Sequence, residues 1–302
     1  MNVPSRLREF NVSGRGLSPR EKEAVGAEFL RAKVPPAALA IWDYKKHFRI
    51  GCYGLARAKE KCIVEGLKSA GIRGLHVRGR SLAPGDWFYK WRETCRVMTA
   101  GRKFLIVPAW RKAPRTRSKR IPVILDPGSA FGTGGHETTQ LMVRLMEGLE
   151  GRFRSFLDAG TGSGVLAIVA AKLGAVIVAG FDNDAMSVKI AAKNYRVNGC
   201  EGGRFFRASL GKLPAVGRFD LVGANLLSKT LLEYRSRLID RLAPGGYLAV
   251  SGIAKRHFPD FRKRFATPRL RLLKVMTGRS WASALYRRRS AQESRSLARF
   301  FC

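Results

Sequence analysis

The first part of the chain alternates between amphipathic helical segments and short apolar segments of strand character. A helix is expected over residues 18–33, because Ser18 can cap its N-terminus, Pro19 suits its first position and Glu21 completes a capping box. After it, short strands are expected over residues 38–44, 48–53 and 75–77, and a second helix over residues 57–70. This order predicts a small α/β domain of about 80 residues, a length that can fold alone.

Further along, apolar strands that end on polar residues alternate with helices. The expected strands cover residues 103–108, 156–159, 176–181, 219–227 and 247–253, and the expected helices 139–149, 185–198 and 231–242, with a turn at Pro244-Gly245-Gly246. Such alternation is typical of a parallel sheet with helices on its faces. A second, larger α/β domain is therefore expected.

A glycine-rich turn, D-A-G-T-G-S-G, joins the strand at 156–159 to the helix after it. Its glycines, Gly160, Gly162 and Gly164, allow a sharp turn and a close approach of the backbone to a ligand. Asp182, at the tip of the next strand, supplies a carboxylate for the two hydroxyls of a ribose at about the twenty-residue offset of nucleoside-binding βαβ units. The order of turn, helix, strand and acid predicts such a unit, and the alternative, a turn that only lets helix and strand pack closely, stays open.

The loop differs from the motifs that bind phosphate. A dinucleotide site has G-x-G-x-x-G, and a Walker loop continues into G-K-[ST], which is missing here. The carboxylate of Asp158 at the start of the loop would repel a pyrophosphate, but it suits a ligand with a positive charge and an amino group. S-adenosylmethionine has both, and it is the expected cofactor.

Residues 125–139 form a second glycine-rich segment, which leads into the expected helix at 139. Its small residues and hydroxyls predict a lid over a ligand, with Thr138 or Thr139 hydrogen-bonding that ligand, although both threonines also suit a helix cap. His136 is expected to act as an architectural hydrogen-bonding group, since no partner spacing supports a metal, and a role as a base is the open alternative. Asn225 ends a strand where the ligand cleft of a parallel sheet lies.

Charge is the most unusual global property of the 302 residues. Lys and Arg total 57 against 22 Asp and Glu, a formal net charge of +35. The densest basic runs, 111–120 and Arg287-Arg288-Arg289, predict contact with a polyanion such as ribosomal RNA. A solvated basic surface without a partner is the open alternative.

The five cysteines are widely spaced and form no C-x-x-C pair, which argues against a zinc site and a disulfide framework. The N-terminal residues lack an apolar signal segment, and the longest apolar run, 164–181, is interrupted by Lys172. We therefore expect a cytoplasmic monomer with no membrane contact and no bound metal.

Many motifs in this chain, taken together, resemble the methyltransferases that modify large-subunit ribosomal protein eleven. These are L-D-P-G-S-A-F-G-T-G-G-H-E-T-T from Leu125, D-A-G-T-G-S-G from Asp158, G-F-D-N-D from Gly180, A-N-L-L from Ala224 and L-A-P-G-G-Y-L-A-V-S-G-I from Leu242. Residues 87–110 also resemble the linker of that family, and Trp281 its last strand.

The resemblance implies an α/β fold of class I methyltransferases, a Rossmann-like seven-stranded sheet preceded by a small α/β (ferredoxin-like) domain. The expected domains are 1–80 for substrate recognition, 81–120 as an aromatic and basic linker, 121–286 for S-adenosylmethionine binding and catalysis, and 287–302 as a basic tail. In the family the residues that match Thr139, Gly160, Asp182 and Asn225 contact the cofactor. We add Gly162 of the same loop, and we assign no catalytic residue. Ser209 stands where the family has an acid near the adenine.

The function that follows from the resemblance is transfer of methyl groups from S-adenosylmethionine to amines of the ribosomal protein, on lysine side chains and/or the N-terminus. An RNA methyltransferase would explain the basic charge, but the chain has no N-P-P-[YF] motif and no catalytic cysteine arrangement. A non-catalytic ribosome-associated or RNA-binding protein is the alternative from a different class.

Overall fold

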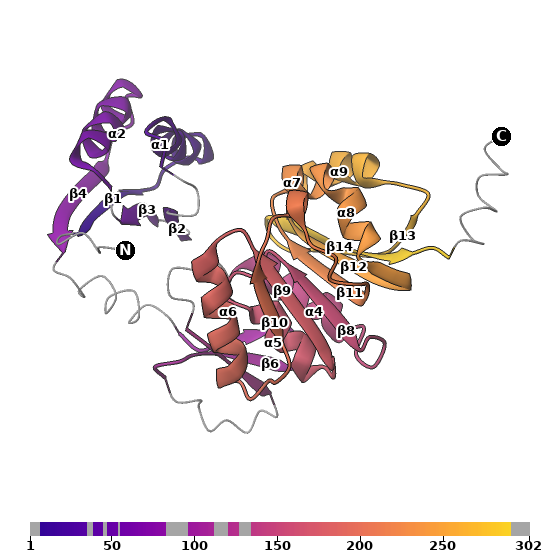
Figure 1. Cartoon of the computed structure of the whole chain (residues 1–302). Coiled ribbons are helices and arrows are strands. Elements are labelled where there is room, and N and C mark those ends of the chain that lie inside the picture. The colour runs from indigo at the N-terminus through magenta and orange to yellow at the C-terminus, as the bar shows by residue number, and fades with distance from the viewer. Residues whose placement is uncertain are drawn as a thin grey trace. The chain divides into compact units, whose positions relative to one another are not determined.

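The computed structural model describes residues 7–34, 39–44, 47–53, 55–82, 96–111, 120–126 and 134–290. The centre of the expected lid, most of the basic run 111–120, the aromatic segment 87–91 and the tail from 291 lie outside these residues. The chain forms two compact units, Met1–Cys95 and Arg96–Cys302 (Figure 1). Among the described helices, none has the length and apolar character needed to cross a membrane.

The described residues of the first unit form a four-stranded antiparallel sheet with two helices. Its elements in chain order are β1 (Leu7–Arg15), α1 (Pro19–Arg31), β2 (Leu39–Tyr44), β3 (His47–Tyr53), α2 (Arg57–Ser69) and β4 (Leu75–Leu82). The strand order β2-β3-β1-β4 is that of a ferredoxin-like βαββαβ fold. The expected capping box is present, since Ser18 Oγ accepts from the Glu21 N–H and the Glu21 carboxylate accepts from the Ser18 N–H. Strand β1 was not predicted.

The second unit contains two sheets. Its elements are β5 (Met98–Ala100), β6 (Phe104–Pro108), β7 (Ile121–Leu125), α4 (Glu137–Glu147), β8 (Ser155–Ala159), α5 (Val165–Lys172), β9 (Ile177–Asp182), α6 (Ala185–Val197), β10 (Arg204–Arg207), β11 (Phe219–Asn225), α7 (Ser228–Glu233), α8 (Arg235–Asp240), β12 (Leu242–Ala254), α9 (Phe258–Phe265), β13 (Leu270–Thr277) and β14 (Trp281–Arg288). The small sheet has the order β5-β6-β7.

The large sheet has seven strands in the order β10-β9-β8-β11-β12-β14-β13. Strand β14 is antiparallel to both of its neighbours, and the remaining neighbours in this sheet are parallel to each other. The chain runs outward from β8 through β9 to β10 and then returns to the other side of β8 with β11. This reversal is the topological switch point of a doubly wound sheet, and ligands bind outside the carboxyl ends of the strands at such a point. The fold class expected from the sequence is confirmed.

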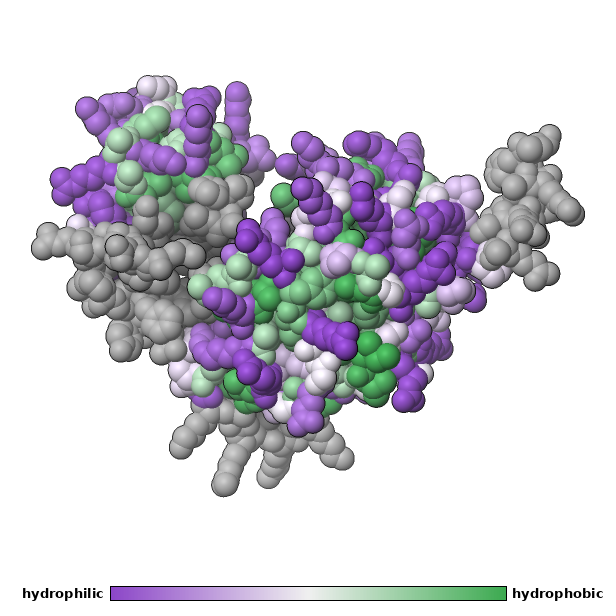
Figure 2. All heavy atoms as spheres, viewed as in Figure 1, coloured by the Kyte–Doolittle hydropathy of each residue, from purple (hydrophilic) through white to green (hydrophobic). Residues whose placement is uncertain are grey.

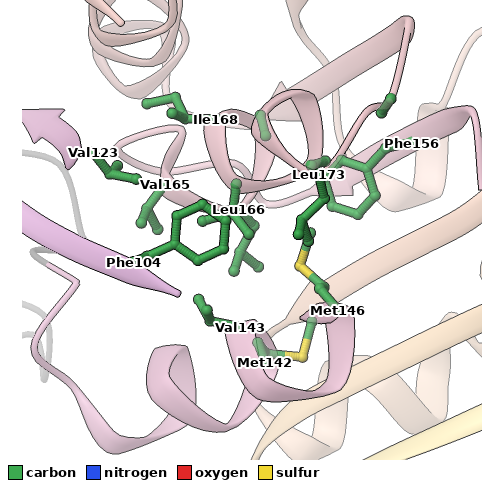
Figure 3. Packing of buried hydrophobic residues seen from close by; sticks show 14 of the residues in the cluster. Phe104, Val123, Met142, Val143, Met146, Phe156, Val165, Leu166, Ile168 and Leu173 are labelled. Atoms are coloured by element: carbon green, nitrogen blue, oxygen red, sulfur yellow. The ribbon is translucent and has the colours of Figure 1, made fainter. Parts of the chain in front are cut away.

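Hydrophobic cores lie on both faces of the large sheet. Neighbouring residues of β8 point to opposite faces, so Phe156 belongs to one cluster and Leu157 to the other. Hydrophilic side chains gather on the surface where α7 and α9 lie (Figure 2). Figure 3 shows Phe104 of β6 packed near Leu166 of α5 and Val143 of α4, so the small sheet shares the core of the first face.

Two expectations in this unit were wrong. The expected helix 231–242 is broken into α7 and α8, because the backbone of Tyr234 leaves helical geometry at φ −103° and ψ 17°. Pro244-Gly245-Gly246 belongs to strand β12, which carries a bulge beside β11. Gly246 is needed there because a Cβ would lie 3.1 Å from the carbonyl oxygen of Asp220. The apolar spacing alone did not show either feature.

Candidate active site

A cavity of about 390 Å³ lies at the switch point, where β8, β9 and β11 end. All five residues that the sequence assigned to cofactor binding line this cavity: Thr139, Gly160, Gly162, Asp182 and Asn225. They come from α4, the loop after β8 and the ends of β9 and β11. Because the carboxyl ends of parallel strands meet at one edge of the sheet, residues up to 86 positions apart face the same space.

The glycines of the loop after β8 have two different surroundings. Gly160, at φ +77°, and Gly162, at φ +51°, line the cavity. Gly164, at φ +81°, precedes α5, and a Cβ there would lie 3.0 Å from the Cα of Ala191 in α6. The first two glycines therefore bring backbone to the cavity, and the third allows α5 and α6 to pack closely.

The N–H groups of this loop are used inside the protein. Those of Gly160 and Thr161 both donate to the carbonyl oxygen of Phe181 at 2.9 Å, and that of Gly162 donates to Asp182 Oδ2 at 3.0 Å. A phosphate-binding loop instead turns its N–H groups toward the anion. The structure therefore agrees with the exclusion of a pyrophosphate ligand.

Asp182 is held in place by two backbone groups. Its Oδ2 accepts from the Gly162 N–H and its Oδ1 accepts from the Asp184 N–H at 3.1 Å. Each oxygen of an ionised carboxylate can accept a further hydrogen bond. The carboxylate is thus fixed in one orientation at the cavity and keeps the capacity to accept from two hydroxyl groups.

Asp158 is the second acid of the cavity and is only 1% exposed. Its Oδ2 accepts from the hydroxyl of Thr161 at 2.9 Å and from the N–H of Ala167 at 3.2 Å. Burial raises the pKa of Asp158 to about 7; these two hydrogen bonds oppose the rise, and the charge of Asp182 adds to it. No Lys or Arg stands among the described residues that line the cavity. The cavity therefore favours a cation.

Asn225 belongs to a hydrogen-bonded chain that reaches α4. Its Nδ2 donates to Thr138 Oγ1 at 3.1 Å, and Thr138 Oγ1 lies 2.7 Å from His136 Nδ1. His136 Nδ1 also accepts from the Thr138 N–H, and burial lowers the pKa of His136, so this nitrogen is an acceptor for the Thr138 hydroxyl. The ring of His136 packs edge-on against Trp281. His136 is therefore the N-cap of α4, which is the architectural role expected for it.

Thr139 is 1% exposed, and its hydroxyl has no hydrogen-bond partner among the described residues. Leaving a buried hydroxyl unpaired costs about 1–3 kcal/mol. Since Thr139 lines the cavity, a bound ligand can supply the missing partner. Neither Thr138 nor Thr139 is the helix cap that the sequence allowed.

Several residues at or near the cavity were not predicted. Tyr234, at the break between α7 and α8, and Leu226, directly after β11, both line it. Asn194 is buried on α6 and joins two segments: it bonds to both backbone groups of Asp126, where the lid begins, and to the carbonyl of Ser163. Ser209, proposed from the sequence for the adenine side, lines the cavity.

Comparison with known proteins gives the family. The family model for ribosomal protein L11 methyltransferase (PrmA) matches residues 27–289. The chain belongs to the ribosomal protein L11 methyltransferase family. This is the family that the motifs had indicated, since L11 is large-subunit protein eleven.

Individual members of the L11 methyltransferase family show the same relationship. The enzyme named ribosomal protein L11 methyltransferase from Pelobacter propionicus is 36% identical over 214 residues, 67% of each chain. The one from Chloroflexus aurantiacus is 34% identical over 236 residues, 70% of this chain and 72% of the relative. The crystal structure of ribosomal protein L11 methylase from Lactobacillus delbrueckii subsp. bulgaricus matches with 32% identity and a TM-score of 0.57, covering 65% of this chain and all of that one.

Membership of the L11 methyltransferase family makes S-adenosylmethionine the methyl donor of this chain. The cavity fits this cofactor in two respects. It places two carboxylates and no described cation around a ligand that carries a sulfonium and an amino group, and it holds the unpaired Thr139 hydroxyl. No three His, Cys, Asp or Glu side chains of the described segments gather into a group able to hold a metal ion.

Proposed function

We propose that this protein transfers methyl groups from S-adenosylmethionine to amines of ribosomal protein L11, on lysine side chains and/or the N-terminal amine. The observation that carries the proposal is the cavity at the switch point, which joins an acid-rich, cation-free lining to the motifs of the L11 methyltransferase family. The first unit, residues 1–80 of the expected division, serves substrate recognition, and residues 121–286 carry the chemistry.

Five residues are proposed to hold the cofactor. Asp182 accepts the two ribose hydroxyls, because its carboxylate is fixed by Gly162 and Asp184 with lone pairs to spare. Gly160 and Gly162 bring their backbone close to the cofactor, and the hydroxyl of Thr139 finds its missing partner there. Asn225 lines the same cavity and is the fifth residue proposed to contact the cofactor.

When bound in this cavity, S-adenosylmethionine would supply a methyl group on a sulfonium, activated for in-line transfer to the lone pair of an amine. The protein has to align the amine and keep it unprotonated. Asn225 is suited to aligning it, because its Nδ2 is committed to Thr138, which leaves Oδ1 to accept an N–H of the amine. The amine loses its proton to water, since the positive charge of the sulfonium disfavours a second cation beside it.

Four further points belong to the same proposal. We place the protein in the cytoplasm, where ribosomes are, and we expect it to act as a monomer. Its excess of 35 positive charges lets it approach ribosomal RNA when L11 is near the ribosome. No residue of the cavity is proposed as a general base.

The test is incubation of the purified protein with radiolabelled S-adenosylmethionine and ribosomal extract, followed by separation of protein and RNA. Label in one small ribosomal protein supports the proposal. Label in RNA would replace it with RNA methylation, the function that the basic charge allows. Absence of label in both fractions, with cofactor binding intact, would assign the enzyme to another protein substrate.

A further inference from the structure

A second cavity, of about 510 Å³, lies away from the switch point on the face of the sheet that α9 covers. Helix α9 and the loop after it form one wall, and β13 and β14 form the other. Leu270, Leu272 and Tyr286 share this face, because Leu272 pairs with Tyr286 across the two strands and Leu270 lies two residues away. The volume is in the range of about 300–1,000 Å³ that small-molecule sites occupy.

Tyr286 contributes a buried donor to this cavity. The residue is 3% exposed, its ring packs on Phe265 with centroids 5.3 Å apart, and its hydroxyl has no hydrogen-bond partner among the described residues. Burial raises the pKa of Tyr286 to about 12, and the nearby Arg262 opposes that rise. The hydroxyl therefore stays protonated, lies within electrostatic reach of Arg262 and lacks an acceptor.

Two cations line the same cavity without partners. The side chains of Arg262 and Lys263 form no hydrogen bond or ion pair with any described residue, and the acid on the same helix, Asp260, faces Arg264 at 3.7 Å. No carboxylate stands among the described residues of the lining. The cofactor cavity has the opposite character, with two carboxylates and no described cation, so the charged side chains of the two linings are opposite in sign.

The surroundings strengthen the positive potential. Arg288 lies on the same face as Tyr286, two residues along β14. Burial lowers the pKa of Arg288, and repulsion from Arg218 and Arg269 lowers it further, while Asp240 opposes the shift. Asp240 is the one acid among these groups and it pairs with Arg269, so this end of the sheet keeps an excess of positive charge.

We propose that the cavity between α9, β13 and β14 is a second ligand site, which binds the phosphate group of a nucleotide, free or within an RNA strand. Arg262 and Lys263 supply charge-assisted hydrogen bonds to the phosphate oxygens, and Tyr286 donates its hydroxyl to the same group. The leucines on β13 give the apolar floor on which a base or sugar packs. This site is separate from methyl transfer, so its failure would leave the proposed function intact.

The experiment measures binding to the whole protein with S-adenosylhomocysteine present in excess, so that the cofactor cavity is blocked. The probes are AMP and adenosine, by calorimetry, and a short fluorescein-labelled single-stranded RNA, by anisotropy. AMP is expected to bind and adenosine to bind at least about tenfold more weakly, because only AMP carries the phosphate. If the RNA binds more tightly than AMP, the site is assigned to an RNA strand. If the RNA and AMP bind with equal affinity, the site is assigned to a free nucleotide.

Two variants locate the binding. Arg262→Gln with Lys263→Gln should weaken AMP binding at least about tenfold, and Tyr286→Phe, which removes only the unpaired hydroxyl, should weaken it several-fold without loss of folding. The matched control is Arg271→Gln with Lys274→Gln, two exposed cations of β13 outside the cavity. Methyl transfer should be unchanged in all of them.

Either of two results overturns the proposal. One is that AMP and RNA do not bind, or bind no better than adenosine. The other is that the control pair weakens binding as much as the cavity pair, which would mean that the basic surface attracts phosphate without a site.

Discussion

Asp182 Oδ2 accepts the backbone N–H of Gly162 at 3.0 Å, so the acid at the end of one strand holds the glycine loop that follows the strand beside it. The two residues are 20 positions apart in the chain and line the same cavity. Loop shape and ribose recognition therefore depend on one carboxylate. Asp182 is consequently the residue whose loss should affect the cofactor most.

Asp182→Ala should raise the dissociation constant for S-adenosylmethionine more than about tenfold, because hydrogen bonds to a charged group contribute about 1.5–3 kcal/mol. The measurement is calorimetric titration with the cofactor. Asp184→Ala is the matched control: Asp184 caps α6 by accepting from Met186 and Ser187, and it does not line the cavity. It should lose about 1 kcal/mol of stability and keep its affinity. Equal affinities for the Asp182 variant and the wild type would show that the ribose lies elsewhere.

Thr139→Val should separate binding from folding. The substitution keeps the shape and removes a buried hydroxyl that has no described partner, so the free protein should be as stable as the wild type or slightly more stable. Cofactor affinity should fall several-fold, because the ligand loses a hydrogen bond. Thermal unfolding with and without S-adenosylhomocysteine reports both quantities, and a stabilisation by ligand equal to that of the wild type would contradict a contact at Thr139.

Thr138→Val makes a contrasting change one residue earlier. It removes the group that holds Asn225 Nδ2, so Asn225 loses its fixed orientation. The turnover rate should fall by more than about tenfold, because positioning acts on the reacting amine. Cofactor affinity should fall less, because Thr139, Gly160, Gly162 and Asp182 still hold the cofactor. Steady-state kinetics with L11 would test this, and an unchanged turnover rate would mean that Asn225 does not orient the acceptor.

Asp158 predicts a pH dependence of cofactor binding. Its pKa is about 7 in the free protein, and a cation in the cavity favours the ionised form, so binding should release a proton below that pH. Affinity should therefore rise as pH increases from about 6 to 8, and Asp158→Asn should flatten this rise. Calorimetry in two buffers of different ionisation enthalpy measures the released proton. A binding enthalpy that is independent of buffer would contradict the linkage.

The stability of the free protein should change with pH in the opposite sense. The unfolded chain ionises Asp158 near its ordinary pKa of 3.8, whereas the folded protein keeps the proton up to about pH 7. The folded state thus binds more protons in this window, and the contribution of Asp158 to stability falls as pH rises through it. Denaturant unfolding at several pH values should show that the free energy of unfolding falls less with rising pH in the Asp158→Asn variant than in the wild type. An equal fall in both proteins would exclude Asp158 as the source of the pH dependence.

Alanine at two glycines of the loop should have different consequences. At Gly164 a Cβ meets the backbone of Ala191, which cannot move easily, so Gly164→Ala should lower stability clearly. At Gly160 the Cβ meets only the side chain of Leu226, which lines the cavity, so Gly160→Ala should mainly weaken cofactor binding. Both carry the cost of a left-handed backbone, about 1–2 kcal/mol. Similar losses of affinity in the two folded variants would contradict this division.

The cavity could be predicted from the sequence because its main residues are local features of single strands. The glycine loop, Asp182 and Asn225 each follow an apolar strand, and the sheet topology brings strand ends together. Residues that support the cavity through hydrogen bonds to distant parts of the chain could not be predicted from the sequence. Asn194 contacts Asp126 across 68 residues, and no pattern within α6 marks that partner.

Strand β1 of the first unit was also not predicted, because one of its buried residues depends on distant partners. Phe10 and Val12 alternate in β1 as a strand requires, but the charged residue just before them, Glu9, does not suggest a core. In the structure Glu9 is 5% exposed and forms ion pairs with Arg80 and Arg49. Buried charges are tolerated when they are paired, and the pairing strands are up to 71 residues away.

Intact-mass spectrometry of purified L11, after incubation with this enzyme and S-adenosylmethionine, decides whether amines of L11 receive the methyl groups. We expect L11 to gain mass in steps of one methyl group, and peptide fragmentation to place the groups on lysines and/or the N-terminal amine. Asp182→Ala should slow the gain. An L11 of unchanged mass, in a reaction where calorimetry shows that the cofactor binds, would contradict methyl transfer to this substrate.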